Sequence, residues 1–140
     1  MINQEIKGIW SVDCMYRPGA QADERVVFLE NGFGWIEILN WSSISVETFN
    51  WTVENARLNI KGELCSSNYE EPESSNLNVV RMEFFVVDEL TPSGKTMKVI
   101  NFSRPICLNN MKFGLLEKDV KDDYYIKRQK LLENKIGLNE

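Results

Sequence analysis

The chain has 140 residues, of which 43% are hydrophobic and 11% aromatic, and its formal net charge is -5 at neutral pH. A chain of this length is best interpreted as one domain, residues 1–140, with a single hydrophobic core. The negative charge argues against non-specific binding of nucleic acid, which needs a surplus of Lys and Arg. No apolar run approaches the roughly 20 residues of a membrane helix, so we expect no membrane insertion.

Histidine is absent from the sequence. Its absence removes the commonest general base and the commonest transition-metal ligand together, so we expect no enzymatic activity, no metal and no cofactor. The three cysteines, Cys14, Cys65 and Cys107, are widely spaced, which suits reduced thiols better than a disulfide framework. The start of the chain lacks the basic and apolar stretches of a secretory signal, so we expect a cytoplasmic protein.

In chain order, most of the sequence alternates apolar and polar residues, the pattern of half-buried β-strands. Eight runs are candidate strands: residues 7–16, 25–30, 33–41, 48–54, 57–64, 77–90, 95–103 and 111–117. In the first run, alternate residues from Trp10 to Tyr16 share one face. Asn31 and Gly32, which join the second run to the third, are typical of a type I′ hairpin turn. The pattern therefore predicts a mainly β fold.

Two segments depart from this alternation. Residues 65–76 (CSSNYEEPESSN) are polar and acidic, and we interpret them as a mobile loop. After residue 118 the apolar period becomes helical, with Val120 and Leu131 on one side of a helical wheel. Asp119 can cap the start, and Gly137 follows the end. The sequence therefore predicts a C-terminal α-helix at about 119–136.

The lengths of the connections indicate how the eight strands are arranged. The links between strands two and three, four and five, and six and seven are short, and the other links are longer or less regular. In an up-and-down meander, alternate links lie at the same end, which gives one tightly closed end and one end with variable loops. A closed antiparallel barrel removes exposed strand edges and leaves room for one small ligand. An open sheet packed on the C-terminal helix is the alternative.

The first candidate strand begins with Gly8-Ile9-Trp10, which resembles the Gly-x-Trp signature of the lipocalins, within the calycin group of barrels. Further residues have a spacing similar to that of short bacterial lipocalin-like domains: Phe28, Gly32, Gly34, Phe49, Trp51, Leu58 and Ile60. The resemblance spans about residues 5–117. It implies an eight-stranded barrel with Gly8 and Trp10 as a plug at the closed end, and Lys118 as the basic residue over that tryptophan. The family's Thr-Asp-x-x-Tyr motif is missing.

If such a barrel holds a ligand, its contacts should lie at the open end and on the inner faces. Aromatic and guanidinium groups near the open end can clasp an amphipathic anion such as a fatty acid. These candidates are Tyr16, Arg17, Trp41, Tyr69 and Arg104. On the inner faces, Trp35, Phe49 and Trp51 either line a cavity or fill it. Polar residues within apolar strands either face solvent or orient the polar head of a ligand: Glu37, Arg81, Glu83 and Asn101.

Two functions stay open at this stage. The leading interpretation is a lipocalin-like protein whose barrel binds a small hydrophobic or amphipathic ligand. The alternative is a protein-interaction module of the inhibitor or immunity type, without a small-molecule ligand. It would present an acidic surface, including Glu70, Glu71 and Glu73, to a basic partner. The apolar stripe of the C-terminal segment fits either a monomer or a homodimer.

Overall fold

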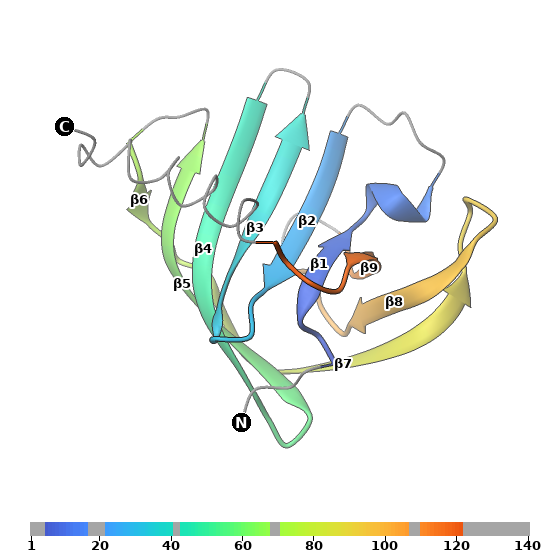
Figure 1. The fold of residues 1–140 in the computed structure, drawn as a ribbon. Helices are drawn as coiled ribbons and strands as arrows, with labels where there is room; N and C mark the ends of the chain where they lie inside the picture. The colour runs from blue at the N-terminus through green and yellow to red at the C-terminus, as the bar shows by residue number, and fades with distance from the viewer. Residues whose placement is uncertain (1–4, 17–21, 41–42, 68–70, 107–109, 122–140) are drawn as a thin grey trace.

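The computed structural model describes residues 5–16, 22–40, 43–67, 71–106 and 110–121, and they form one antiparallel sheet (Figure 1). A short 3₁₀ helix, η1, spans Asp13–Met15. The strands are β1 (Gly8–Ser11), β2 (Ala22–Phe28), β3 (Phe33–Asn40), β4 (Ser43–Glu54), β5 (Arg57–Ser67), β6 (Glu73–Ser74), β7 (Asn78–Leu90), β8 (Thr96–Phe102) and β9 (Lys112–Glu117).

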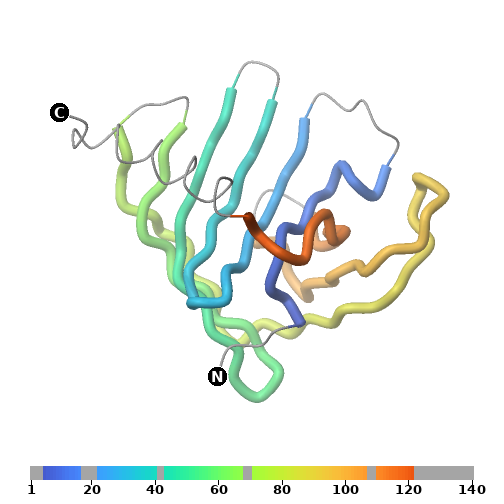
Figure 2. Tube along the Cα trace, viewed as in Figure 1, coloured from blue at the N-terminus to red at the C-terminus, as the bar shows by residue number. Residues whose placement is uncertain are grey.

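The order of the strands closes a ring. The sheet runs β4-β3-β2-β1-β9-β8-β7-β5-β6, and β4 also pairs with β5, so that eight strands form the ring and β6 lies outside it. Figure 2 shows β2, β3 and β4 rising side by side while the β7–β8 hairpin reaches away from them. The expected mainly β, antiparallel, barrel-like meander of eight strands is confirmed. The predicted helix at 119–136 lies almost wholly outside the described residues.

The first strand is shorter than predicted, because β1 ends at Ser11 and η1 follows. Two side chains hold the chain in this turn. The Ser11 hydroxyl oxygen accepts a hydrogen bond from the Cys14 backbone N–H (3.1 Å), and the Asp23 carboxylate accepts one from the Asp13 N–H (2.8 Å). Such side-chain bonds to the backbone compete with strand pairing. Val12 still packs against the same buried cluster as Trp10, and the predicted common face from Trp10 to Tyr16 is wrong only beyond Val12, where η1 begins.

The tight turns also differ from the prediction. Among the described residues other than glycine, positive φ angles occur at Asn55 (52°), Ala56 (60°) and Arg81 (52°). Asn31 is not one of them, so the turn between β2 and β3 is not type I′; Gly32 alone has a positive φ there (88°). The two successive positive φ angles of a type I′ turn are found instead at Asn55-Ala56, between β4 and β5.

Two predicted loops are partly strand. β3 ends at Asn40 and β4 begins at Ser43, so the link between these two strands, which the sequence predicted to be longer, comprises only residues 41–42. In the acidic segment, β5 continues to Ser67 and β6 pairs with it. Backbone bonds extend this pairing, because the N–H of Gly62 donates to the carbonyl of Leu77 (2.8 Å). Pairing with β5 satisfies backbone groups that a free loop would expose to water.

The short turns do not all gather at one end, as the connection lengths suggested. The β7–β8 turn lies against η1, in the connection between β1 and β2, where the Ser93 N–H donates to the Met15 carbonyl (3.0 Å). The β4–β5 turn lies at the bottom of the view in Figure 1, away from the β7–β8 turn at the upper right. The cause is the length of β7, which continues beyond the last residue paired with β5, Glu83, and carries its turn away from the ring.

Buried apolar side chains form two clusters on opposite faces of the sheet. The inner cluster, inside the ring, contains Ile6, Trp10, Val26, Phe28, Ile36, Phe49, Trp51, Leu58, Ile60, Val79, Met82, Ile100, Phe102, Ile106 and Phe113. The outer cluster contains Ile9, Val27, Trp35 and Val46, with Leu29, Phe33, Ile44 and Val120 at its margin. Neighbouring residues of a strand point to opposite faces, which places Ile36 inside and Trp35 outside.

Candidate functional site

The residues predicted to line the barrel interior are divided between the two clusters. Phe49 and Trp51 lie inside the ring, where Phe28 contacts both of their rings, at centroid distances of 5.7 and 5.2 Å. Trp35 lies in the outer cluster, and its indole N–H donates to the buried carboxylate of Glu37 (2.8 Å). The prediction that Trp35 shares the inner face with Phe49 and Trp51 is therefore corrected. Alternate side chains of β3 point to opposite faces of the sheet, and Trp35 points outward.

Gly8 and Trp10 lie where β1 enters the ring. The buried indole of Trp10 donates to the carbonyl of Ile6 (2.8 Å), which fastens the segment before β1 to the inner cluster. Gly8 has a φ of 139°, and a Cβ there would lie 2.7 Å from the Glu117 carbonyl oxygen. Lys118 donates to the Glu5 carbonyl (3.2 Å). Partial burial is the main cause that lowers the pKa of Lys118, and the positive charge of Lys7 lowers it further.

Two of the five residues predicted at the open end lie in the described part of the chain. Tyr16 is 50% exposed and directly follows η1. Arg104 is exposed, and its guanidinium donates to the Val80 carbonyl on β7 (3.2 Å). These two residues are thus attached to different elements. Arg17, Trp41 and Tyr69 lie outside the described residues.

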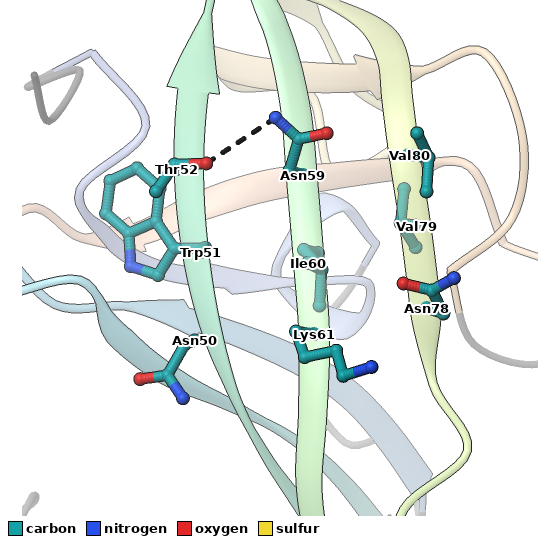
Figure 3. Close-up of a pocket in the computed structure, with 9 residues that line it drawn as sticks. All are labelled: Asn50, Trp51, Thr52, Asn59, Ile60, Lys61, Asn78, Val79 and Val80. Carbon is teal, nitrogen blue, oxygen red and sulfur yellow. Dashed lines mark hydrogen bonds between the residues drawn. The ribbon is translucent and has the colours of Figure 1, made fainter.

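A hollow of about 270 Å³, here called the wall hollow, lies on the outer face of β4, β5 and β7 (Figure 3). It is lined by Asn50, Trp51, Thr52, Asn59, Ile60, Lys61, Asn78, Val79 and Val80. Lys61 on β5 lies directly opposite Asn50 on β4 and Asn78 on β7. Its ammonium group therefore has one amide side chain on each side. Trp51, Ile60 and Val79 belong to the inner cluster and direct their side chains into the ring, so the side chains around the wall hollow on the outer face are mostly polar.

A β-bulge shapes one side of the wall hollow. Leu58 pairs with Met82 and Ile60 with Val79, so Val80 and Arg81 together face the single residue Asn59. The extra residue leaves the Arg81 N–H without a ladder partner, and the side-chain oxygen of Asn59 accepts it (3.0 Å). The sequence marked Arg81 only as a polar residue in an apolar strand. The bulge itself depends on the register between β5 and β7, which the sequence did not give.

Positive charge surrounds this part of the wall. A second hollow of about 290 Å³ is lined by Glu54, Asn55, Arg57 and Arg81. The cationic side chains near the two hollows are Arg57, Lys61, Arg81 and Arg104, and Arg57 forms an exposed ion pair with Glu83 (3.3 Å). Among the residues that line the two hollows, Arg57, Lys61 and Arg81 are cationic and Glu54 is acidic, although the chain as a whole has a net charge of -5.

A polar cluster beside η1 has the residue types of a nucleophilic site. The Ser11 hydroxyl donates to Asp23 (2.7 Å), and the Arg25 guanidinium donates to the same carboxylate (2.8 Å). Burial raises the pKa of the Cys14 thiol, hydrogen bonding with Ser11 opposes this shift, and the carboxylates of Asp23 and Asp13 raise the pKa further. The thiol is therefore protonated at neutral pH and is a poor nucleophile. These contacts hold η1 in place.

Within the described ranges, no three Cys, Asp or Glu side chains are grouped in a way that could hold a metal ion. No helix within those ranges has the length and apolar character needed to cross a membrane. Comparison with protein-family models, with curated proteins and with solved structures gave no match to this chain.

Proposed function

We propose that this chain is a lipocalin-like, calycin-type barrel that acts as a binding module for another protein, through the outer wall formed by β4, β5 and β7. The assignment to the barrel group is supported by the ring of eight antiparallel strands in up-and-down order. It is also supported by the Gly8-Ile9-Trp10 sequence at the entry of β1, with Trp10 buried in the inner cluster.

The inner cluster favours a barrel filled by its own side chains. It contains six aromatic residues, Trp10, Phe28, Phe49, Trp51, Phe102 and Phe113, and Phe102 contacts Phe113 at a centroid distance of 5.9 Å. The interior of an eight-stranded barrel is just wide enough for side chains to fill it. Recognition at the surface is therefore favoured over uptake of a ligand into the barrel.

The wall hollow is the observation that carries the proposal. Its amide groups can donate to and accept from a partner's backbone or carboxylate, and Lys61 adds a charge that strengthens a bond to a carboxylate. Arg57 and Arg81, which line the second hollow, are also positively charged. The partner that fits is an acidic segment of another protein. An acidic surface for a basic partner, which includes the exposed residues Glu71 and Glu73, stays the alternative.

The experiment is a nuclear magnetic resonance titration with a short poly-glutamate peptide, and with a poly-lysine peptide of equal length. We expect poly-glutamate to shift the side-chain amide signals of Asn50, Asn59 and Asn78, and Lys61→Glu to abolish these shifts. Lys95→Glu, an exposed charge reversal in the β7–β8 turn, is the matched control and should leave them unchanged. Shifts caused only by poly-lysine, or shifts that survive Lys61→Glu, would contradict the proposal.

Binding of a small hydrophobic ligand inside the barrel stays a prediction with its own test. Trp10 and Trp51 report on the inner cluster. Titration of the protein with oleate, followed by tryptophan fluorescence, should give no saturable change if the interior is filled. A saturable change that is unaffected by Lys61→Glu would favour the ligand-binding alternative.

A further inference from the structure

Three sulfur-bearing side chains converge where η1 packs against β8 and β9. Cys14 and Met15 belong to η1, and Met97 is the second residue of β8. A Cβ built on Gly114 of β9 would lie 2.7 Å from the Met97 sulfur, 2.8 Å from the Met15 Cγ and 3.0 Å from the Cys14 sulfur. The three side chains, here called the sulfur cluster, therefore meet over a residue that has no side chain of its own.

The sulfur cluster lies on the outer face of the sheet. Gly114 alternates with Phe113 and Leu115, whose side chains pack in or against the inner cluster, so Gly114 faces outward. Cys14 and Met97 are both partly exposed, whereas Met15 is 6% exposed. An ion from solvent can therefore reach two of the three side chains without entering the ring.

The distance between the sulfurs suits a single metal ion. The Cys14 sulfur lies 3.9 Å from the Met97 sulfur. Two sulfurs bonded to one ion at about 2.3 Å, with an angle of about 115° between the bonds, are themselves about 3.9 Å apart. The Met15 sulfur is one bond beyond the Cγ that lies at the same point, so rotation of this side chain can supply a third ligand.

The charges around Cys14 favour a cation. One carboxylate oxygen of Asp13, Oδ1, is buried and accepts no hydrogen bond from the described residues. Burial and, to a smaller extent, the carboxylates of Asp23 and Asp13 raise the pKa of the Cys14 thiol. Burial and nearby carboxylates disfavour a bare thiolate, but a thiolate that binds a monovalent cation carries no net charge and avoids both costs.

We propose that the sulfur cluster binds one Cu(I) ion through the Cys14 thiolate and the thioethers of Met15 and Met97. Thiolate and thioether are the soft ligands that select Cu(I). Zn(II) takes Cys, His and carboxylate ligands, and the described residues hold no such group of three. As the copper–sulfur bond forms, the thiol proton passes to water, and the copper stays Cu(I). The expectation of no metal rested on the absence of histidine, which a site built from sulfur does not need.

This site is independent of the protein-binding role proposed for the wall hollow. The wall hollow is lined by residues of β4, β5 and the start of β7, and the sulfur cluster belongs to η1 and β8. Either site can therefore be disrupted while the other stays intact.

The first test uses Ag(I), a soft monovalent probe that air does not oxidise. It is made in a variant with Cys65→Ser and Cys107→Ser, in which Cys14 is the only thiol. The methyl signals of the five methionines are followed by nuclear magnetic resonance. With one equivalent of Ag(I), we expect the signals of Met15 and Met97 to shift.

Met111 is the matched control for this titration. It is 43% exposed, more than Met97, so binding that depended on access alone would shift its signal first. We expect the Met111 signal to stay in place. A shift of Met111 as large as that of Met97, or the absence of a shift at Met15 or at Met97, would overturn the proposal.

The affinity for Cu(I) gives the second measurement, made without oxygen in the same background by competition with the chelator bathocuproine disulfonate. Cys14→Ser should weaken binding by more than about 100-fold, because even substitutions outside a ligand set cost about 10- to 100-fold. Met97→Leu, which conserves volume, should weaken it at least about tenfold, and Met111→Leu should not change it. Equal affinities of all these variants would contradict the proposal. If Cys14→Ser unfolds, as seen by circular dichroism, the Met97→Leu result decides.

Discussion

The wall from β2 to β4 and the β7–β8 hairpin are built from the same kind of strand but are held in different ways. Every residue of β3, Phe33–Asn40, pairs with β4, and β2 pairs with the other side of β3. Among the described strands, the end of β7 pairs with β8 alone. Its tip is tied to the rest of the chain by the bond from Ser93 to Met15. Burial therefore stabilises the wall, while the hairpin is held by fewer contacts.

The largest expected effect is the loss of an aromatic ring from the wall. Phe28 is fully buried between Phe49 and Trp51, so Phe28→Ala should lower the free energy of unfolding by about 3–5 kcal/mol. Phe85→Ala removes the same ring from the exposed face of the hairpin and should change it by less than about 0.5 kcal/mol. Urea unfolding measures both values. Similar losses for the two variants would show that the hairpin is as tightly packed as the wall.

An intermediate effect is expected where the wall and the hairpin are joined. Asp23 accepts hydrogen bonds from Ser11, Arg25 and the Asp13 backbone, and so positions η1 against the Ser93 turn. Asp23→Asn should cost about 1.5–3 kcal/mol, because hydrogen bonds to a buried charged group are lost. It should also speed amide hydrogen exchange at Ser93. The exposed control Glu63→Gln should change neither the stability nor the exchange rate. An unchanged exchange rate at Ser93 in Asp23→Asn would show that η1 does not hold the hairpin in place.

The sequence predicted the strands well because alternation reports burial on one face of a sheet. The pairs on β4 and β5, such as Trp51 and Ile60, show this alternation clearly. It did not predict the position of Trp35, since a strand covered on both faces places apolar side chains on both, and the inner face then has no distinctive pattern.

The candidate sites were harder to predict, because they depend on pairing between distant segments. The wall hollow requires Asn59 to meet the bulge at Arg81, and the pairing of β5 with β7 ends at Glu83 because β5 begins opposite that residue. Neither the register nor the bulge is visible in a single strand. Only the residue types were available beforehand, and Arg81 and Glu83 were noted on that basis alone.

The smallest expected effect concerns the β4–β5 turn, where the wall ends and the partner strand of β7 begins. Ala56 has a φ of 60°, a conformation in which its Cβ is crowded and which glycine adopts freely. Ala56→Gly should therefore raise the free energy of unfolding by about 0.5–1 kcal/mol. Ala22→Gly, in the exposed start of β2, is the matched control and should lower it by about the same amount, because glycine is unfavourable in a strand. If both variants are destabilised in urea unfolding, Ala56 is not in the left-handed conformation. The end of the wall, beyond which β7 no longer pairs with β5, would then have to be placed differently.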